Sequence, residues 1–184
     1  MKLSLLALVV GLQAAWMLGT VFQQERRLAE GQLILLETRP VDPRDLLRGD
    51  YVILAYGISQ VPTASLVPPA PDRVPIEAGA PVFVELRQEG EFHILHRASL
   101  TSLDPDPGNI VLRGRVSSRG WADRGETLLR VEYGLERYYV REGTGNPVGK
   151  LTVQVAVARS GNALIKQVFL DGVPYVEAMK SQVP

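Results

Sequence analysis

Apolar residues fill the start of the chain without interruption, and later they alternate with polar residues in short runs. No formal charge occurs between Leu3 and Gln24, a stretch of 22 residues. A helix of that length reaches roughly 33 Å at about 1.5 Å per residue, enough to cross a hydrocarbon core of roughly 30 Å. Lys2 precedes the stretch and Glu25 follows it. The pattern predicts a transmembrane helix, with residues 1–27 as an N-terminal membrane anchor.

A cleaved signal peptide is the alternative interpretation of this segment. Its apolar region would be shorter, and small residues would occupy positions −3 and −1 of a cleavage site. Cleavage after Ala15 would place Gln13 at position −3, which favours an uncleaved anchor. Lys2 and the amino terminus favour a cytoplasmic N-terminus, whereas Arg26 and Arg27 weaken that preference. We therefore expect the C-terminal part on the outer, periplasmic side of the membrane.

The remaining residues, 28–184, carry the pattern of one β-rich domain. Short runs rich in β-branched and aromatic residues are separated by turn signals such as Glu89-Gly90 and Ser160-Gly161-Asn162. Frequent turns and little helix favour an antiparallel β-sandwich or a small, partly open barrel. The predicted strands are Gln32–Thr38, Asp50–Ser59, Pro81–Gln88, Glu91–Leu100, Asn109–Ser117, Thr127–Tyr133, Leu151–Ala158 and Ala163–Leu170.

Two segments of this domain have distinctive patterns. Residues 60–80 contain five prolines and are predicted to form a long surface loop. In the strand Asp50–Ser59, one face carries Val52, Leu54, Tyr56 and Ile58. The opposite face carries Tyr51, Ile53 and Ala55. Since both faces are apolar, we expect this strand to lie in the middle of a sheet.

The composition excludes several classes of function. Lys plus Arg and Asp plus Glu number 20 each, so the chain has no bulk field that would attract nucleic acid, and no nucleic-acid partner is expected. There is no cysteine, which excludes disulfides, thiol catalysis and thiolate metal sites. The two histidines, His93 and His96, lie three residues apart in a predicted strand and therefore on opposite faces. A shared metal site is not expected there.

The segment before the apolar strand has the features of a capped helical turn. Asp42 suits the N-cap and Pro43 the first helical position. Asp45 would stabilise the positive end of the turn, and Arg48 the negative end. Gly49 can adopt the left-handed conformation that ends it. We expect one turn over residues 43–48, feeding directly into the strand.

Three carboxylates in this segment also suggest a site for Ca²⁺ or Mg²⁺, formed by Asp42, Asp45 and Asp50. The capping roles of the first two, and the guanidiniums of Arg44 and Arg48, favour a structural role instead. Arg48-Gly49-Asp50 also spells an adhesion tripeptide, which such a short motif produces by chance. A Ser/Lys hydrolase using Lys150 or Lys166 lacks a recognisable nucleophile context. We therefore expect no catalytic residue, metal or cofactor.

The residues Gly49-Asp50-Tyr51-Val52-Ile53-Leu54-Ala55-Tyr56 resemble the signature of the GDYXXLXY proteins, a family of bacterial membrane-anchored proteins. The preceding residues 40–48, a second block at 133–143 and the later Leu170-Asp171-Gly172 are also similar to the family. Arg141 departs from the resemblance, since proline would be expected there. The resemblance implies an N-terminal membrane segment and a β-rich domain of unknown role, beside integral membrane partners.

These inferences predict a membrane-tethered envelope domain without enzymatic activity that binds a partner or serves as an accessory subunit. We expect a single-pass protein of the bacterial cytoplasmic (inner) membrane, with an integral membrane protein as partner. The alternatives are a membrane-surface hydrolase and a module that binds a small ligand or a metal. The candidate residues, for interaction or for structure, are Asp42, Pro43, Arg44, Asp45, Arg48, Gly49, Asp50, Tyr51, Leu54 and Tyr56.

Overall fold

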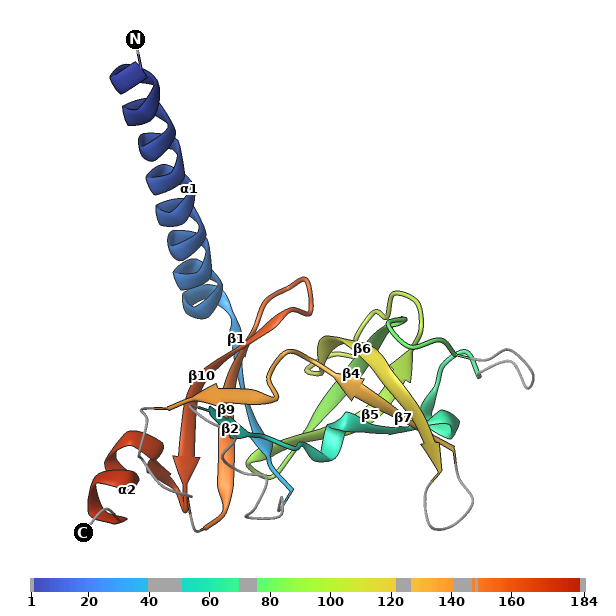
Figure 1. The fold of residues 1–184 in the computed structure, drawn as a ribbon. Helices are drawn as coiled ribbons and strands as arrows, with labels where there is room; N and C mark the ends of the chain where they lie inside the picture. Colours follow the sequence, from blue (N-terminus) through green and yellow to red (C-terminus); the bar gives the residue numbers. More distant parts are fainter. Residues whose placement is uncertain are drawn as a thin grey trace.

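The computed structural model describes residues 2–39, 51–69, 76–121, 127–140, 147 and 149–182. Within this part of the chain the protein is mainly β, with one long helix at the N-terminus and a short helix at the C-terminus (Figure 1). All strand pairings in the sheets are antiparallel. The predicted antiparallel β domain is therefore confirmed, in the form of a nearly closed, barrel-like arrangement.

Helix α1 (Lys2–Glu30) projects away from the β domain (Figure 1). It contains the whole apolar stretch that the sequence predicts to be helical. In the described part of the chain, however, no helix is long and apolar enough to span a membrane. The helix is thus confirmed, while the crossing of a membrane stays a prediction.

A four-stranded sheet continues directly from this helix. Its strand order is β1-β9-β10-β11. The strands are β1 (Gln32–Glu37), β9 (Leu151–Val157), β10 (Ala163–Leu170) and β11 (Val173–Pro174). Buried residues alternate along β1 and along the first part of β9, as the period of two in their sequences requires, and the last three residues of β9 are all buried.

A five-stranded sheet forms the other half of the domain, in the order β3-β7-β6-β4-β5. Its strands are β3 (Gln60–Pro62), β7 (Thr127–Glu132), β6 (Ile110–Trp121), β4 (Pro81–Glu89) and β5 (Phe92–Ser99). The predicted β4–β5 hairpin is confirmed, and Gly90 at its tip has a φ of 62°. A left-handed residue is what so tight a turn requires, and glycine adopts it without steric cost.

Shorter elements complete the domain. Strands β2 (Tyr51–Ile53) and β8 (Arg137–Tyr139) form a separate two-stranded ribbon. The 3₁₀ turns η1 (Gly57–Ser59) and η2 (Thr63–Ser65) flank β3. Helix α2 (Tyr175–Gln182) follows β11 and buries Tyr175 and Met179.

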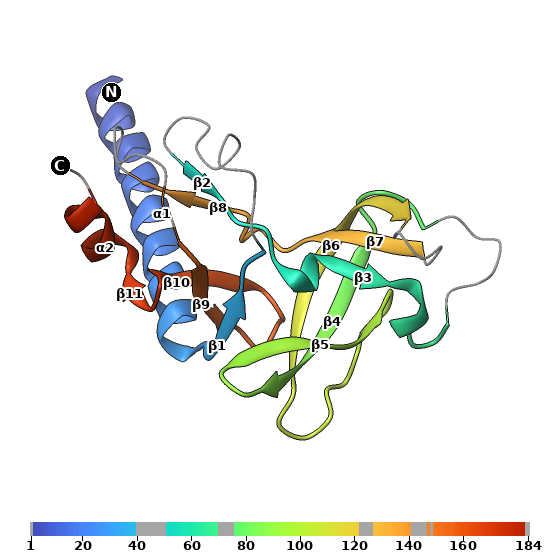
Figure 2. The same ribbon diagram turned by 90° about the horizontal axis from the view of Figure 1, so that it is seen from below.

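Two contacts join the sheets and bring the arrangement close to closure (Figures 1 and 2). On one side β1 contacts β5. On the other side the turn between β9 and β10 reaches β6, where the backbone N–H of Arg113 donates to the carbonyl of Gly161 at 2.8 Å. A Cβ at Gly161 would lie 3.1 Å from that same backbone nitrogen. The glycine therefore permits the close approach.

Two expectations drawn from the sequence are wrong in detail. The strand predicted for Asp50–Ser59 ends at Ile53 and pairs with β8 alone among the described residues, so it is not central. Its apolar second face is half-buried at Tyr51 and Ile53 rather than covered by another strand. The proline-rich segment 60–80 is not wholly a surface loop, since it supplies β3 and buries Val61 and Leu66. Pro62 is compatible with a strand there because β3 lies at the edge of its sheet.

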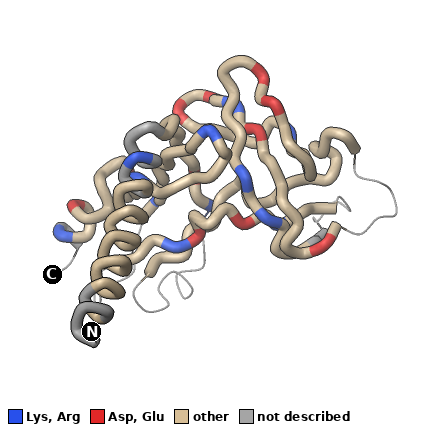
Figure 3. Tube along the Cα trace, turned by 90° about the horizontal axis from the view of Figure 1, so that it is seen from above, with Lys and Arg blue, Asp and Glu red and all other residues tan. Residues whose placement is uncertain are grey.

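Charge is distributed unevenly between the helix and the domain. Figure 3 shows basic and acidic positions spread over the strands, whereas the described middle of α1 carries neither. The core of the domain contains two buried polar residues, Glu85 and Ser99, among the described residues.

Candidate functional site

Of the ten candidate residues, the structure describes Tyr51, Leu54 and Tyr56. The predicted turn and its residues Asp42, Pro43, Arg44, Asp45, Arg48, Gly49 and Asp50 lie outside the described residues. Leu54 and Tyr56 are almost completely buried, with 2% and 1% of their surfaces exposed. Val52, Leu54, Tyr56 and Ile58, which the sequence predicts to share one strand face, all belong to the core, although the strand itself ends at Ile53.

The hydroxyl of Tyr56 connects this segment to residues 133–143, the second block that resembles the family. It donates a hydrogen bond of 2.7 Å to the backbone carbonyl of Leu135. Nearby, the backbone N–H of Leu54 donates to the carbonyl of Glu136 at 2.8 Å. In the reverse direction, the hydroxyl of Tyr133 donates to the carbonyl of Ile58 at 2.7 Å. The two sequence blocks are therefore held together by reciprocal hydrogen bonds inside the core.

Burial raises the pKa of the Tyr56 and Tyr133 hydroxyls well above its ordinary value, and the carboxylate of Glu136 raises both further. Glu136 itself accepts a hydrogen bond from the backbone N–H of Tyr133 at 2.6 Å. Both phenols consequently stay protonated as hydrogen-bond donors. The geometry gives them a structural role.

Replacing Tyr56 by phenylalanine should lower the free energy of unfolding by about 1–2 kcal/mol, because it leaves the buried Leu135 carbonyl without its donor. Tyr175 provides a matched control. It is 2% exposed, and its hydroxyl has no hydrogen-bond partner among the described residues. Tyr175→Phe should therefore be neutral or slightly stabilising. Urea denaturation of both variants checks the pair, and equal losses would contradict the assignment.

Tyr51 lies on the opposite, half-buried face of the same segment. Its ring contacts the ring of Tyr139 edge-on, with centroids 6.0 Å apart. The guanidinium of Arg137 lies 5.2 Å from the centroid of Tyr51. Tyr139 is 71% exposed. The β2–β8 ribbon thus presents an aromatic face with one cation, which we call the Tyr51 face (Tyr51, Arg137, Tyr139).

A groove of about 410 Å³ lies where β1 meets β5 and η1. We call it the seam groove. It is lined by Leu36, Glu37, Thr38, Arg39, Gly57, Ile58, Phe92, His93, Ile94 and Leu95. Its edge continues into the signature segment, because the backbone N–H of Arg39 donates to the carbonyl of Ala55 at 2.7 Å. The signature segment therefore lies next to this groove and is joined to its edge through the backbone.

His93 is the titratable group of greatest interest in the seam groove. Burial lowers its pKa, and a hydrogen bond with the backbone of Leu35 opposes that shift only in part. Its Nδ1 is buried and has no hydrogen-bond partner among the described residues. The imidazole is therefore held neutral at the junction of the two sheets.

A second groove of about 430 Å³ lies on the other side of Phe92. Lys150 lies over the ring of Phe92, 5.3 Å from its centroid, and pairs with Glu37 at 2.5 Å. Asp171 accepts a hydrogen bond from the backbone N–H of Lys150 at 2.8 Å. The remaining lining is mixed, with Leu35, Glu91, Thr152, Gln154, Phe169 and Gly172. Lys150 and Glu37 are thus paired with each other, and Asp171 binds the backbone of Lys150.

A family model described as GDYXXLXY protein matches residues 13–168. The chain belongs to this family. No curated protein matches the chain, and no solved structure matches it.

In this GDYXXLXY protein the two histidines lie in different environments. His93 faces the seam groove, whereas His96 is exposed, with its Nε2 3.7 Å from a carboxylate oxygen of Asp106. The prediction that they lie on opposite faces of a strand agrees with this separation. No group of three or more His, Asp or Glu side chains suited to a metal occurs among the described residues.

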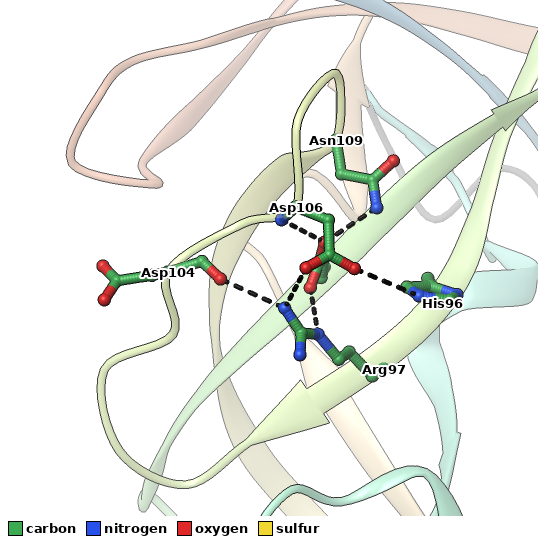
Figure 4. Close-up of polar contacts among 6 residues, drawn as sticks. His96, Arg97, Asp104, Asp106 and Asn109 are labelled. Carbon is green, nitrogen blue, oxygen red and sulfur yellow. Dashed lines mark hydrogen bonds and ion pairs between the residues drawn. The ribbon is translucent and has the colours of Figure 1, made fainter.

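A buried polar network that the sequence does not reveal centres on Glu85 (Figure 4). The carboxylate of Glu85 is fully buried and pairs with the guanidinium of Arg97. It also accepts hydrogen bonds from the backbone N–H of Asp106 at 2.8 Å and from the side chain of Asn109 at 2.7 Å. Arg97 in turn donates to Asp106 and to the carbonyl of Asp104.

Burial alone would raise the pKa of Glu85, but the hydrogen bonds from Arg97, Asn109 and Asp106 outweigh it and hold the pKa below its ordinary value. Every donor in this network comes from β5 or from the loop before β6. The network therefore fastens the 100–109 loop onto the five-stranded sheet. All its buried groups are satisfied, which is typical of a structural element rather than a catalytic one.

Proposed function

We propose that this GDYXXLXY protein is a non-enzymatic domain, tethered by α1 to a bacterial cytoplasmic membrane, that binds an integral membrane protein. The observation that carries the proposal is the distribution of apolar side chains on α1. Leu8, Val10, Trp16 and Leu18 are each between 55% and 72% exposed. At about 100° per residue these positions point in different directions around the axis. A helix that is apolar on all sides needs apolar surroundings.

Although no described helix is long and apolar enough to span a membrane, the uncharged stretch of the sequence and the charges that flank it favour a bilayer as those surroundings. The charge-free stretch of 22 residues matches the thickness of a hydrocarbon core, roughly 30 Å. Charged residues lie directly at both of its ends, where they would reach the headgroups. Beyond its junction with β9 and β10 the helix projects from the domain, so its apolar sides are available to lipid (Figure 1).

The Tyr51 face supports a role in binding a protein. Tyrosine and arginine are enriched at the energetically dominant positions of interfaces. Tyr139 is large and mostly exposed, and Tyr51 and Arg137 already pack beside it, so little side-chain entropy would be lost on binding. Glu85 and Lys150, two ionisable groups that could support catalysis, are instead engaged in ion pairs within the domain.

Extraction of cell membranes with alkaline carbonate tests the tether. The full chain should remain in the membrane pellet, and protease added outside spheroplasts should digest the β domain. The variant Leu12→Arg/Leu18→Arg should shift to the soluble fraction, because arginine at the centre of a membrane helix costs about 2.5–3.5 kcal/mol. Leu33→Arg, at a leucine that is 43% exposed on β1, is the matched control and should stay in the pellet. Release of the unaltered protein by carbonate would refute the tether.

Co-purification from mild detergent, followed by mass spectrometry, tests the partner. The full chain should retain an integral membrane protein, and Tyr139→Ala should reduce its recovery at least tenfold. Val173→Ala removes another exposed apolar side chain, one that is 44% exposed on β11, and should have no effect. Repeated recovery of the protein alone, or equal effects of the two variants, would argue against binding through the Tyr51 face.

A further inference from the structure

We propose that the β domain docks on the bilayer through an arginine surface beside the base of α1, which binds the anionic phosphates of lipid headgroups. The arginine surface consists of Arg113, Arg115 and Arg159. This inference rests on the proposed tether, because α1 must bring the domain to the membrane. It adds that one defined side of the domain lies against the lipid.

Strand pairing brings Arg159 to the α1 end of the domain. Strand β1 begins at Gln32, two residues after α1 ends, and Gln32 pairs with Val157 of β9. Val157 also pairs with Ala163 of β10, so the turn between these strands lies at the same end as the helix. Helix α1 contacts both β9 and β10. Arg159 lies in that turn and is exposed.

The same turn leads on to the two arginines of β6. The backbone N–H of Arg113 donates to the carbonyl of Gly161, which places this part of β6 directly against the turn. Arg113 and Arg115 are two residues apart on one strand and both are exposed, so they share the outer face of the sheet. In Figure 3, which looks down from the side on which α1 projects, basic positions lie near the helix base, at the adjoining turn and along the strand beyond it.

The three guanidiniums of the arginine surface differ from several other cations of the domain in having no carboxylate partner in the part of the chain that the structure describes. Arg97, Arg87 and Lys150 all form ion pairs with carboxylates. Within the described residues no carboxylate forms an ion pair with Arg113, Arg115 or Arg159, although Glu132 lies opposite Arg115 in the strand register. Arg113 lies over the ring of Phe83, 5.9 Å from its centroid, which holds it extended across the sheet without neutralising it.

The reach of the helix places this surface close to the headgroups. The charge-free stretch ends at Gln24 and α1 ends at Glu30, so about six residues, or roughly 9 Å, separate the bilayer from the domain. That is within the Debye length of about 10 Å at 0.1 M salt, so the attraction to anionic lipid is only partly screened. Each arginine near an anionic surface favours docking by roughly fivefold, and three of them by about a hundredfold.

The test uses the full chain in nanodiscs of phosphatidylcholine, with or without phosphatidylglycerol. The chain has no cysteine, so Ser160→Cys in the exposed turn gives a unique position for a fluorophore. Lipids carrying a headgroup quencher should quench this label strongly in anionic discs and weakly in zwitterionic discs. The variant Arg113→Gln/Arg115→Gln/Arg159→Gln should lower the docking equilibrium in anionic discs by about a hundredfold, as should high salt.

Two controls keep the test specific. Arg87→Gln/Lys150→Gln/Lys180→Gln removes the same charge elsewhere and should leave the quenching unchanged. A label at Glu89→Cys, on the β4–β5 tip near the opposite end of β1, should be quenched weakly in both discs. Equal quenching at Ser160 in the two lipids, or equal effects of the two triple variants, would overturn the inference while leaving the tether intact. Failure of the full chain to enter either disc would overturn the tether and the docking together.

Discussion

Replacing Leu54 by alanine is expected to lower the free energy of unfolding by about 2–5 kcal/mol. Leu54 belongs to the signature segment, is 2% exposed and lies in the same core as Leu135. Its truncation removes buried apolar surface and leaves a cavity that the surrounding β-structure can fill only in part. Because domains of this size are stable by about 5–15 kcal/mol, this single change threatens folding itself. Urea denaturation of the full chain in detergent measures the loss.

Leu33→Ala is the matched control for this prediction. Leu33 lies on β1 with 43% of its surface exposed, so the same chemical change removes much less buried surface. Equal losses from the two variants would show that Leu54 is not a core residue. A large loss from Leu54→Ala alone would assign this position of the family signature to folding.

Glu85→Gln is expected to lower the free energy of unfolding by about 2–4 kcal/mol. An amide can accept one of the hydrogen bonds from Asp106 and Asn109, but it cannot neutralise the guanidinium of Arg97. The loss is large because the Glu85 carboxylate is fully buried and its partners are arranged around a negative charge. Glu89→Gln, at an exposed carboxylate paired with Arg87, should change the stability little.

The same residue gives the domain a defined sensitivity to acid. The folded state lowers the pKa of Glu85 below its ordinary value of 4.5, so the unfolded state binds the proton more readily. The stabilisation is therefore fully present above that value and is lost as the pH falls through the lowered pKa. Denaturation between pH 7 and pH 3 should show a steeper loss for the unaltered protein than for Glu85→Gln. Parallel curves would contradict the role given to this carboxylate.

The structure changes the meaning of the family signature. Leu54 and Tyr56 are buried, and the hydroxyl of Tyr56 donates a hydrogen bond to the carbonyl of Leu135. Among the described signature residues, Tyr51 remains accessible enough to contact a partner, through the face that it shares with Tyr139. A partner that binds this GDYXXLXY protein would therefore contact the exposed Tyr51 face. It would not contact the buried side chains of the signature directly.

Much of the architecture follows from local sequence. The period of two in Leu151–Val157 and the turn at Gly161 determine β9, β10 and their hairpin, because each depends on neighbouring residues. The β4–β5 hairpin follows from Gly90 for the same reason. The uncharged N-terminal stretch determines a long helix. The apolar alternation from Val52 to Ile58 correctly identifies a buried face, even though the strand itself stops at Ile53.

Contacts between distant residues could not be obtained in this way. The hydroxyl of Tyr56 bonds to a residue 79 positions away, and Glu85 receives donors from residues 21 and 24 positions away. A periodic pattern predicts which side of a strand is buried, but it does not predict which strand packs against that side. For that reason Glu85, which follows four apolar residues in β4, gives no sign in the sequence of the network that encloses it, and the local pattern does not predict β8 or α2.

By itself, therefore, the sequence determined the family, the apolar helix and the antiparallel β character of the domain, since these depend on contiguous residues and short-range periodicity. Only the tertiary structure decided that Leu54 and Tyr56 serve the core, that His93 lies at the seam between two sheets, and that Arg113 and Arg159 come together beside α1. The physical reason is that these arrangements arise when the sheets close on one another, which brings together residues that no local pattern connects.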